Sequence, residues 1–181
     1  NEKGKISLDD KILFTEKLKL PGSGVLQWMK GSRYYTIRNL VRLMIVLSDN
    51  TATRMVINKI GTPEINSYME SLGLSNTKIT DITCLNEPPQ KFINYTTPDD
   101  MAYLLLLMKE SKKFTTESKI EMINFMKRQK YRWGIWRGVP NGIVVADKTG
   151  NVEGVLNDIG IVYAPKGPYI LSIFTNGFKK Q

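Results

Sequence analysis

The sequence predicts an α+β fold in which a helical cluster, about residues 1–130, packs on an antiparallel sheet, about residues 140–178. Two observations support this prediction. Apolar residues recur at helical spacing through the first part, and three runs rich in β-branched and aromatic residues lie near the C-terminus, separated by Gly, Pro and Asn. A chain of 181 residues is long enough for one domain with its own core, and we expect a single domain over residues 1–181.

Five helices are expected in the helical part. Thr36 is a suitable N-cap for the first, because the apolar residues of the segment from Ile37 to Ile45 fall on one helical face. The others are expected over about Thr51–Ile60, from about Ile65 to Leu72 with Gly73 as the stop, after Thr97 and Pro98, and over about Thr116–Gln129. The segment from about Ser75 to Tyr95 has two prolines and few periodic apolar positions, which indicates one long loop.

The sheet is expected to be a three-stranded antiparallel meander formed by "GIVVADK", "DIGIVYAP" and "YILSIFTNG". The last strand ends at Phe178 with little chain left to pair with it, and the first residues offer no partner strand. Intact domains usually avoid such an open edge. We therefore expect a fold that is incomplete at both ends.

The composition excludes several kinds of chemistry. The chain has no histidine, so a Ser-His-Asp triad and histidine metal ligands are excluded, and its single cysteine, Cys84, excludes an internal disulfide and a cysteine-cluster zinc site. We expect no metal and no cofactor. The net charge of +9 attracts anions, but the basic residues are scattered, so nucleic acid is not an expected partner. No apolar run approaches the ~18 residues of a membrane span.

Two tripeptides stand in informative places. Ser48-Asp49-Asn50 lies between two expected helices, and Lys148-Thr149-Gly150 lies at the end of the first expected strand. Alone, the first would be interpreted as a helix cap and turn cluster. Together they are the S-D-N and K-T-G elements of class A β-lactamases and penicillin-binding proteins, and their separation of 100 residues favours the catalytic interpretation.

With these motifs and the stretches "PGSGVLQ", "LMIVLSDNTATRMVINKIG", "NYTTPDDMA" and "NDIGIVYAP", the chain resembles the class A β-lactamase-like serine hydrolases over essentially its whole length. The resemblance implies a β-lactamase/transpeptidase-like fold. It also implies transfer of an acyl group, from a β-lactam or a D-Ala-D-Ala-like peptide, through a serine acyl-enzyme. An extracytoplasmic location is implied as well, although the chain itself shows no signal sequence.

The resemblance implies roles for the S-D-N residues. The Ser48 hydroxyl would relay a proton to the departing nitrogen, and the Asn50 amide would hold the acylamide side chain of the substrate. Asp49 would be structural, with its carboxylate accepting hydrogen bonds from backbone N–H groups.

The resemblance implies roles for the K-T-G stretch too. Lys148 would supply positive charge for the substrate carboxylate and ease proton transfer at Ser48, and Thr149 would donate its hydroxyl to that carboxylate. Gly150 would let the substrate approach the strand edge. The backbone N–H of Asn151 would form half of the oxyanion hole.

The chain departs from the family pattern at the nucleophile. No S-x-x-K motif precedes Ser48, since Ser7 has its lysine one place too far, at Lys11. Ser75 and Lys78 match the spelling but follow S-D-N in an expected loop, which we interpret as coincidence. We expect the nucleophile to lie outside this chain, which would then be inactive alone and would need a complementing N-terminal segment.

The deacylating Glu-Pro pair is a second departure. The favoured alignment matches Leu85 and Asn86, of which Asn86 would lie near the site, and leaves Ile82-Thr83 at the Glu-Pro position. The other alignment uses Glu87 as the base. The first predicts slow deacylation, as in a penicillin-binding D,D-peptidase, and the second predicts a β-lactamase. A third hypothesis is a non-catalytic carboxylate-binding domain of the same fold.

Overall fold

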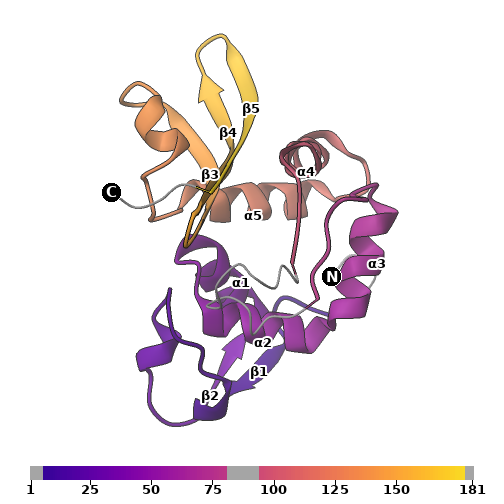
Figure 1. The fold of residues 1–181 in the computed structure, drawn as a ribbon. Coiled ribbons are helices and arrows are strands. Elements are labelled where there is room, and N and C mark those ends of the chain that lie inside the picture. Colours follow the sequence, from indigo (N-terminus) through magenta and orange to yellow (C-terminus); the bar gives the residue numbers. More distant parts are fainter. Residues whose placement is uncertain (1–5, 81–93, 178–181) are drawn as a thin grey trace. The chain divides into compact units, whose positions relative to one another are not determined.

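The computed structural model describes residues 6–80 and 94–177. The chain forms two compact units, shown in Figure 1. The first comprises residues 1–73 and 78–94, and the second comprises residues 74–77 and 95–181.

The first unit holds a two-stranded sheet, two short 3₁₀ helices and three α-helices. Its elements are β1 (Lys11–Phe14), η1 (Glu16–Leu18), η2 (Leu26–Trp28), β2 (Arg33–Thr36), α1 (Ile37–Val46), α2 (Asn50–Ile60) and α3 (Thr62–Ser71).

The sequence pattern did not predict the two-stranded sheet of β1 and β2. The two strands pair antiparallel, with Leu13 opposite Tyr34, and form their own sheet separate from the C-terminal one. Each strand has only four residues, too few for alternation to stand out in the sequence. The part of the chain that was expected to be helical therefore also contains this small sheet.

Local chemistry predicts the start of α1 and the end of α2, whereas α3 begins at Thr62, three residues before the expected start near Ile65. The Thr36 hydroxyl accepts a hydrogen bond from the Asn39 N–H at 3.2 Å, which confirms it as the cap of α1. Gly61, with φ of 93°, ends α2 in a conformation that side-chain-bearing residues rarely adopt. The apolar faces of α1 and α2 meet β1 and η2 in one buried core of Phe14, Leu26, Leu40, Ala52, Met55 and Val56.

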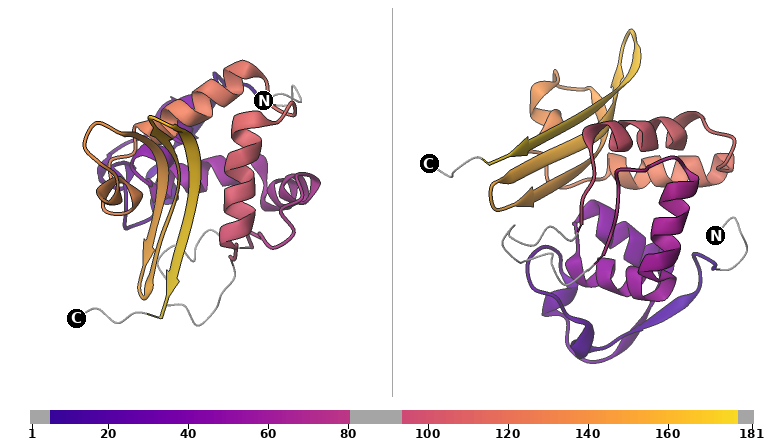
Figure 2. Two further views of the ribbon diagram at one scale, coloured as in Figure 1. Left: turned by 90° about the horizontal axis from the view of Figure 1, so that it is seen from above. Right: turned by 45° about the vertical axis from the view of Figure 1, so that its right-hand side comes forward.

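The second unit holds two α-helices, a 3₁₀ helix and a three-stranded sheet. Its elements are α4 (Pro98–Glu110), α5 (Thr116–Lys127), η4 (Ile135–Gly138), β3 (Val144–Val152), β4 (Val155–Ala164) and β5 (Gly167–Asn176). The order β3-β4-β5, antiparallel throughout, confirms the expected meander (Figure 2). The strand β3 runs through the K-T-G residues to Val152, so the motif lies within the strand, whereas the sequence pattern predicts it at the end of the strand.

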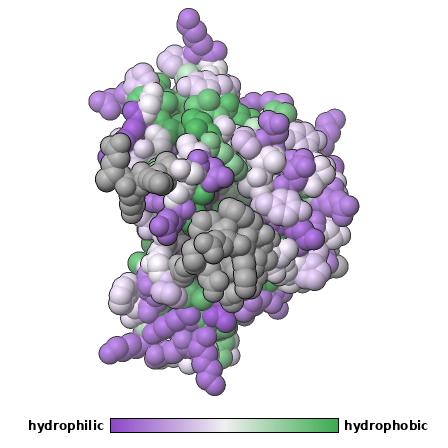
Figure 3. Space-filling view, in the orientation of Figure 1, coloured by the Kyte–Doolittle hydropathy of each residue, from purple (hydrophilic) through white to green (hydrophobic). Residues whose placement is uncertain are grey.

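The two faces of the C-terminal sheet pack against different partners. Ile135 of η4 packs with Val145 and Val162 on one face, which we call the η4 face. On the other face the Lys127 ammonium of α5 lies 4.5 Å from the centre of the Tyr163 ring. Figure 3 shows hydrophobic residues gathered over this sheet on the visible side of the molecule. Helices packed on an antiparallel sheet confirm the α+β class.

Candidate active site

The S-D-N residues lie at the junction between α1 and α2. Ser48 has φ of 48°, and among residues 6–80 and 94–177 it is the one residue other than glycine with positive φ. This conformation costs roughly 1 kcal/mol or more for a residue with a Cβ, and it persists where the surroundings hold it in place. The chain reverses there, and Asn50 begins α2.

Asp49 is buried, and its carboxylate accepts hydrogen bonds from backbone N–H groups. Its Oδ2 atom accepts hydrogen bonds from the Val25 and Leu26 N–H groups at 2.7 and 2.9 Å, and its Oδ1 accepts one from the Ala52 N–H at 2.9 Å. The side chain is 1% exposed. One carboxylate thus caps α2 and also fixes the loop that precedes η2, which is the kind of structural role expected from the sequence.

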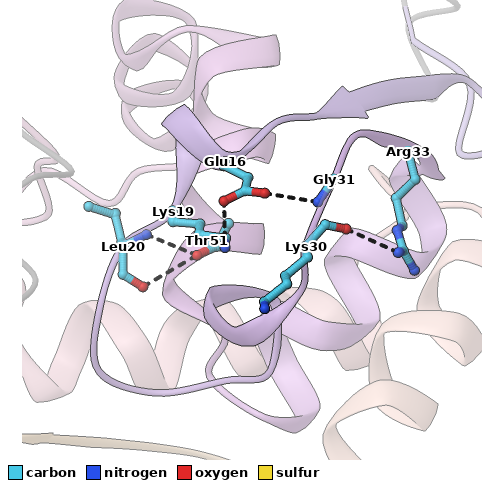
Figure 4. Close-up of polar contacts among 7 residues, drawn as sticks. All are labelled: Glu16, Lys19, Leu20, Lys30, Gly31, Arg33 and Thr51. Carbon is cyan, nitrogen blue, oxygen red and sulfur yellow. Dashed lines mark hydrogen bonds and ion pairs between the residues drawn. The ribbon is translucent and has the colours of Figure 1, made fainter.

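The neighbouring residues hold the same loop. The Asn50 amide donates to the Pro21 carbonyl at 2.8 Å, and the Thr51 hydroxyl accepts from the Leu20 N–H at 3.0 Å and donates to the Leu20 carbonyl at 3.3 Å (Figure 4). Farther along, the Glu16 carboxylate accepts from the Gly31 N–H at 2.9 Å. Thr51 was not predicted from the sequence, because a threonine inside a helix carries no signal of a partner 31 residues away.

The approach of the loop to Asp49 requires a glycine at position 24. A Cβ added at Gly24 would lie 2.3 Å from the Asp49 Cγ atom, and Gly24 has φ of 99°. We expect Gly24→Ala to lower the free energy of unfolding by about 2 kcal/mol more than Gly31→Ala does. Gly31 is the matched control, because it also has positive φ but its added Cβ would meet nothing within 4 Å. Denaturant unfolding of both variants checks this, and equal losses would contradict it.

The K-T-G residues lie on β3, one of the two edge strands of the three-stranded sheet within the described residues. A two-residue turn joins β3 to β4 and closes on the pair Val152 and Val155. Hydrogen-bonded pairs alternate from that closing pair, so the backbone N–H groups of Thr149 and Asn151 point away from β4, toward the outer edge. Thr149 is buried, whereas Gly150 and Asn151 are exposed.

Lys148 places a cation beside this edge. Its ammonium donates a hydrogen bond to the Thr149 carbonyl at 2.5 Å. Burial lowers the pKa of Lys148 to about 8, against the opposing influence of the Asp158 and Asp147 carboxylates. A cation and outward backbone N–H groups side by side suit the binding of an anionic group.

Other residues singled out in the sequence do not belong to these two sets. Glu87 and Asn86 lie outside the described residues. Ser75 and Lys78 lie in no helix, unlike the S-x-x-K motif of the family.

Within residues 6–80 and 94–177, no three His, Cys, Asp or Glu residues gather in a way that could hold a metal ion. None of the helices in that part of the chain is long and apolar enough to cross a membrane.

The sequence matches known proteins along its whole length. The model of the beta-lactamase enzyme family matches residues 1–181. The chain is 31% identical over 155 residues to a beta-lactamase of Bacillus licheniformis, covering 81% of this chain and 50% of that protein. It is 28% identical over 181 residues to beta-lactamase 3 of Bacillus cereus, covering 97% of this chain and 57% of the relative. The chain thus spans about half the length of these curated relatives.

The fold also matches solved structures. A beta-lactamase from Sphaerobacter thermophilus is 32% identical with a TM-score of 0.89, covering 97% of this chain and 68% of that one. PBP-A, in a single-residue variant described as an acyl-enzyme complex with penicillin G, is 29% identical with a TM-score of 0.88, covering 99% and 67%. The match of the family model to all 181 residues shows that the chain belongs to the beta-lactamase enzyme family.

Proposed function

We propose that the protein is a class A β-lactamase-like serine hydrolase that transfers the acyl group of a β-lactam to a serine and then to water. The nucleophilic serine would lie outside these 181 residues, in a complementing N-terminal segment. Both units would belong to one catalytic domain, located outside the cytoplasm in the periplasm or medium. Family membership and the two motifs support this proposal.

The observation that carries the proposal is the edge of β3. A substrate carboxylate would bind the Lys148 ammonium and the Thr149 hydroxyl, and Gly150 would leave room along the strand. The outward backbone N–H of Asn151 would donate to the oxyanion that forms at the attacked carbonyl. No metal or cofactor is required by these steps.

The S-D-N residues would have separate roles in the reaction. Ser48 would relay a proton to the departing nitrogen, and Asn50 would bind the acylamide group of the substrate. Asp49, which lies between these two residues, and Thr51, which follows them, make hydrogen bonds that hold the local backbone.

A penicillin-binding protein with slow deacylation is the second candidate. The similarity to PBP-A, at 28–29% identity, favours it. In that case a D-Ala-D-Ala-like peptide would be the natural substrate, and Glu87 would not serve as the base for deacylation. A non-catalytic carboxylate-binding domain remains the hypothesis that a failed acylation would favour.

Mass spectrometry of the full-length gene product with a penicillin tests the proposal. A covalent adduct on the protein, or drug that has gained one water, is the expected result. An adduct that persists would identify the penicillin-binding behaviour, and rapid hydrolysis would identify a β-lactamase with Glu87 or another base. Unchanged masses of both protein and drug would contradict both catalytic proposals.

A further inference from the structure

Two buried aspartates lie next to each other beneath the η4 segment. Asp147 on β3 pairs with Gly160 on β4, and Asp158 on β4 pairs with Thr149 on β3. Side chains two residues apart on a strand share one face of the sheet. Asp147 and Asp158 are therefore diagonal neighbours on the η4 face, and the carboxyl group of Asp158 is near enough for its charge to raise the pKa of Asp147.

Each of the two carboxyl groups has one oxygen atom that lacks a donor. The Oδ2 atom of Asp147 and the Oδ1 atom of Asp158 are buried and have no hydrogen-bond partner within the described part of the chain. The two residues are 1% and 4% exposed. Buried carboxylate oxygens without donors are costly, and two adjacent buried negative charges also repel each other.

The chain leaves little space for an outside donor at Asp158. Its other oxygen, Oδ2, accepts a hydrogen bond from the Ile135 N–H at 2.7 Å. The backbone at Gly134 passes so close that an added Cβ would lie 2.1 Å from that oxygen. The segment before η4 thus closes over the carboxyl group.

Two cations lie near the pair, and neither donates to the orphaned oxygens. The Arg132 guanidinium lies over the Trp136 ring, 4.9 Å from its centre, and its charge favours ionised Asp147. The Lys148 side chain leaves β3 on the opposite face from Asp147, and its charge favours the ionised form of both aspartates. These cations offset negative charge but do not provide the missing hydrogen bond.

We propose that Asp147 and Asp158 hold one proton between them at neutral pH and act as positioning residues for Lys148. One carboxyl group would take up a proton from solvent, and its O–H would donate to the orphaned oxygen of the other group. The pair would then carry one negative charge beside the positive charge of Lys148. Burial and the neighbouring Asp158 raise the pKa of Asp147 to about 7, and burial raises the pKa of Asp158, in agreement with this arrangement.

Carbon-13 NMR of the aspartate carboxyl groups in the full-length gene product tests the shared proton directly. We expect one of the two carboxyl groups to remain protonated at pH 6 and to titrate near pH 7, about three units above an ordinary aspartate. Asp158→Asn should remove the repulsion and lower the titration midpoint of Asp147, whereas Asp9→Asn, an exposed control, should leave it unchanged. Two carboxyl groups that are both ionised at pH 6 would overturn the proposal.

Stability gives a second readout. The pKa of Asp147 is raised in the folded state, so its contribution is present below the unfolded value near 4 and is lost as the pH rises through about 7. The melting temperature should therefore fall across that range. Asp147→Asn, which supplies a permanent N–H donor without charge, should flatten the fall relative to Asp9→Asn. An unchanged slope would contradict the shared proton.

The positioning role is tested at Lys148. Asp158→Asn removes a negative charge that favours the protonated form of Lys148. We therefore expect the midpoint of the Lys148 titration, measured by NMR, to move from about pH 8 to a lower pH. An unshifted Lys148 titration would overturn the positioning role. Its importance for substrate binding rests on the proposed function, but these titrations can be measured even if no β-lactam reacts.

Discussion

Replacing Lys148 with alanine is expected to slow acylation of the full-length gene product by a penicillin on the order of a hundredfold or more. The Lys148 ammonium lies at the outer edge of β3, beside backbone N–H groups that point outward. Without it, the substrate carboxylate would lose its charged partner, and a charge-assisted hydrogen bond would be lost with it. Stopped-flow measurement of acylation, followed by intact mass, checks the loss.

Two further variants distinguish the loss of the Lys148 charge from a general effect of replacing a lysine. Lys166→Ala removes an exposed lysine from the turn between β4 and β5 and should leave the acylation rate unchanged. Lys148→Arg keeps the charge at all accessible pH values. We expect Lys148→Arg to retain part of the acylation activity. In the parent protein the acylation rate should fall as the pH rises past about 8 and Lys148 loses its charge, whereas the arginine variant should not show this fall. An alanine variant that is acylated as fast as the parent would remove Lys148 from the site.

The helices could be predicted from the sequence because their boundaries are encoded locally. Thr36 and Thr97 each accept a hydrogen bond from the N–H three residues on, and Gly61 ends α2 with positive φ. The meander was predictable for a similar reason, since its strands are nine or ten residues long and rich in β-branched residues. Such signals need no knowledge of distant residues.

The contacts that shape the candidate site could not be predicted in this way. Gly24 must be a glycine because of Asp49, 25 residues later, and Gly134 because of Asp158. An aspartate next to a lysine in the sequence, as at Asp147, gives no sign that its side chain faces another aspartate across the sheet. Register and burial decide these contacts, and both depend on the tertiary fold.

The motif residues could be predicted from the sequence only in part. The sequence identified Ser48 to Asn50 and Lys148 to Asn151 by their resemblance to a family, and the structure adds the local geometry of each set in its own unit. It shows that Asp49 is satisfied by three backbone N–H groups. The catalytic roles of the other motif residues stay predictions until acylation is measured.

Replacing Asp49 with alanine is expected to cause a large loss of stability, about 3–5 kcal/mol in the free energy of unfolding. The carboxylate accepts hydrogen bonds from the N–H groups of Val25, Leu26 and Ala52, so its removal would leave three donors unsatisfied, two of them in a loop far away in sequence. The side chain is almost fully buried, and solvent can replace those bonds only if the loop opens. Such a loss is a large fraction of the 5–15 kcal/mol typical of a folded domain.

Denaturant unfolding of Asp49→Ala, Asp49→Asn and Asp9→Ala distinguishes this role from a general effect of losing a carboxylate. Asn keeps one acceptor oxygen, so its loss should be intermediate, and Asp9 is exposed, so its replacement should change stability by less than about 1 kcal/mol. Because Asp49 fixes both the start of α2 and the loop at residues 20–26, Asp49→Ala should also increase amide hydrogen exchange at Val25 and Leu26. Unchanged exchange there, with stability retained, would show that the loop is held by Asn50 and Thr51 without the carboxylate.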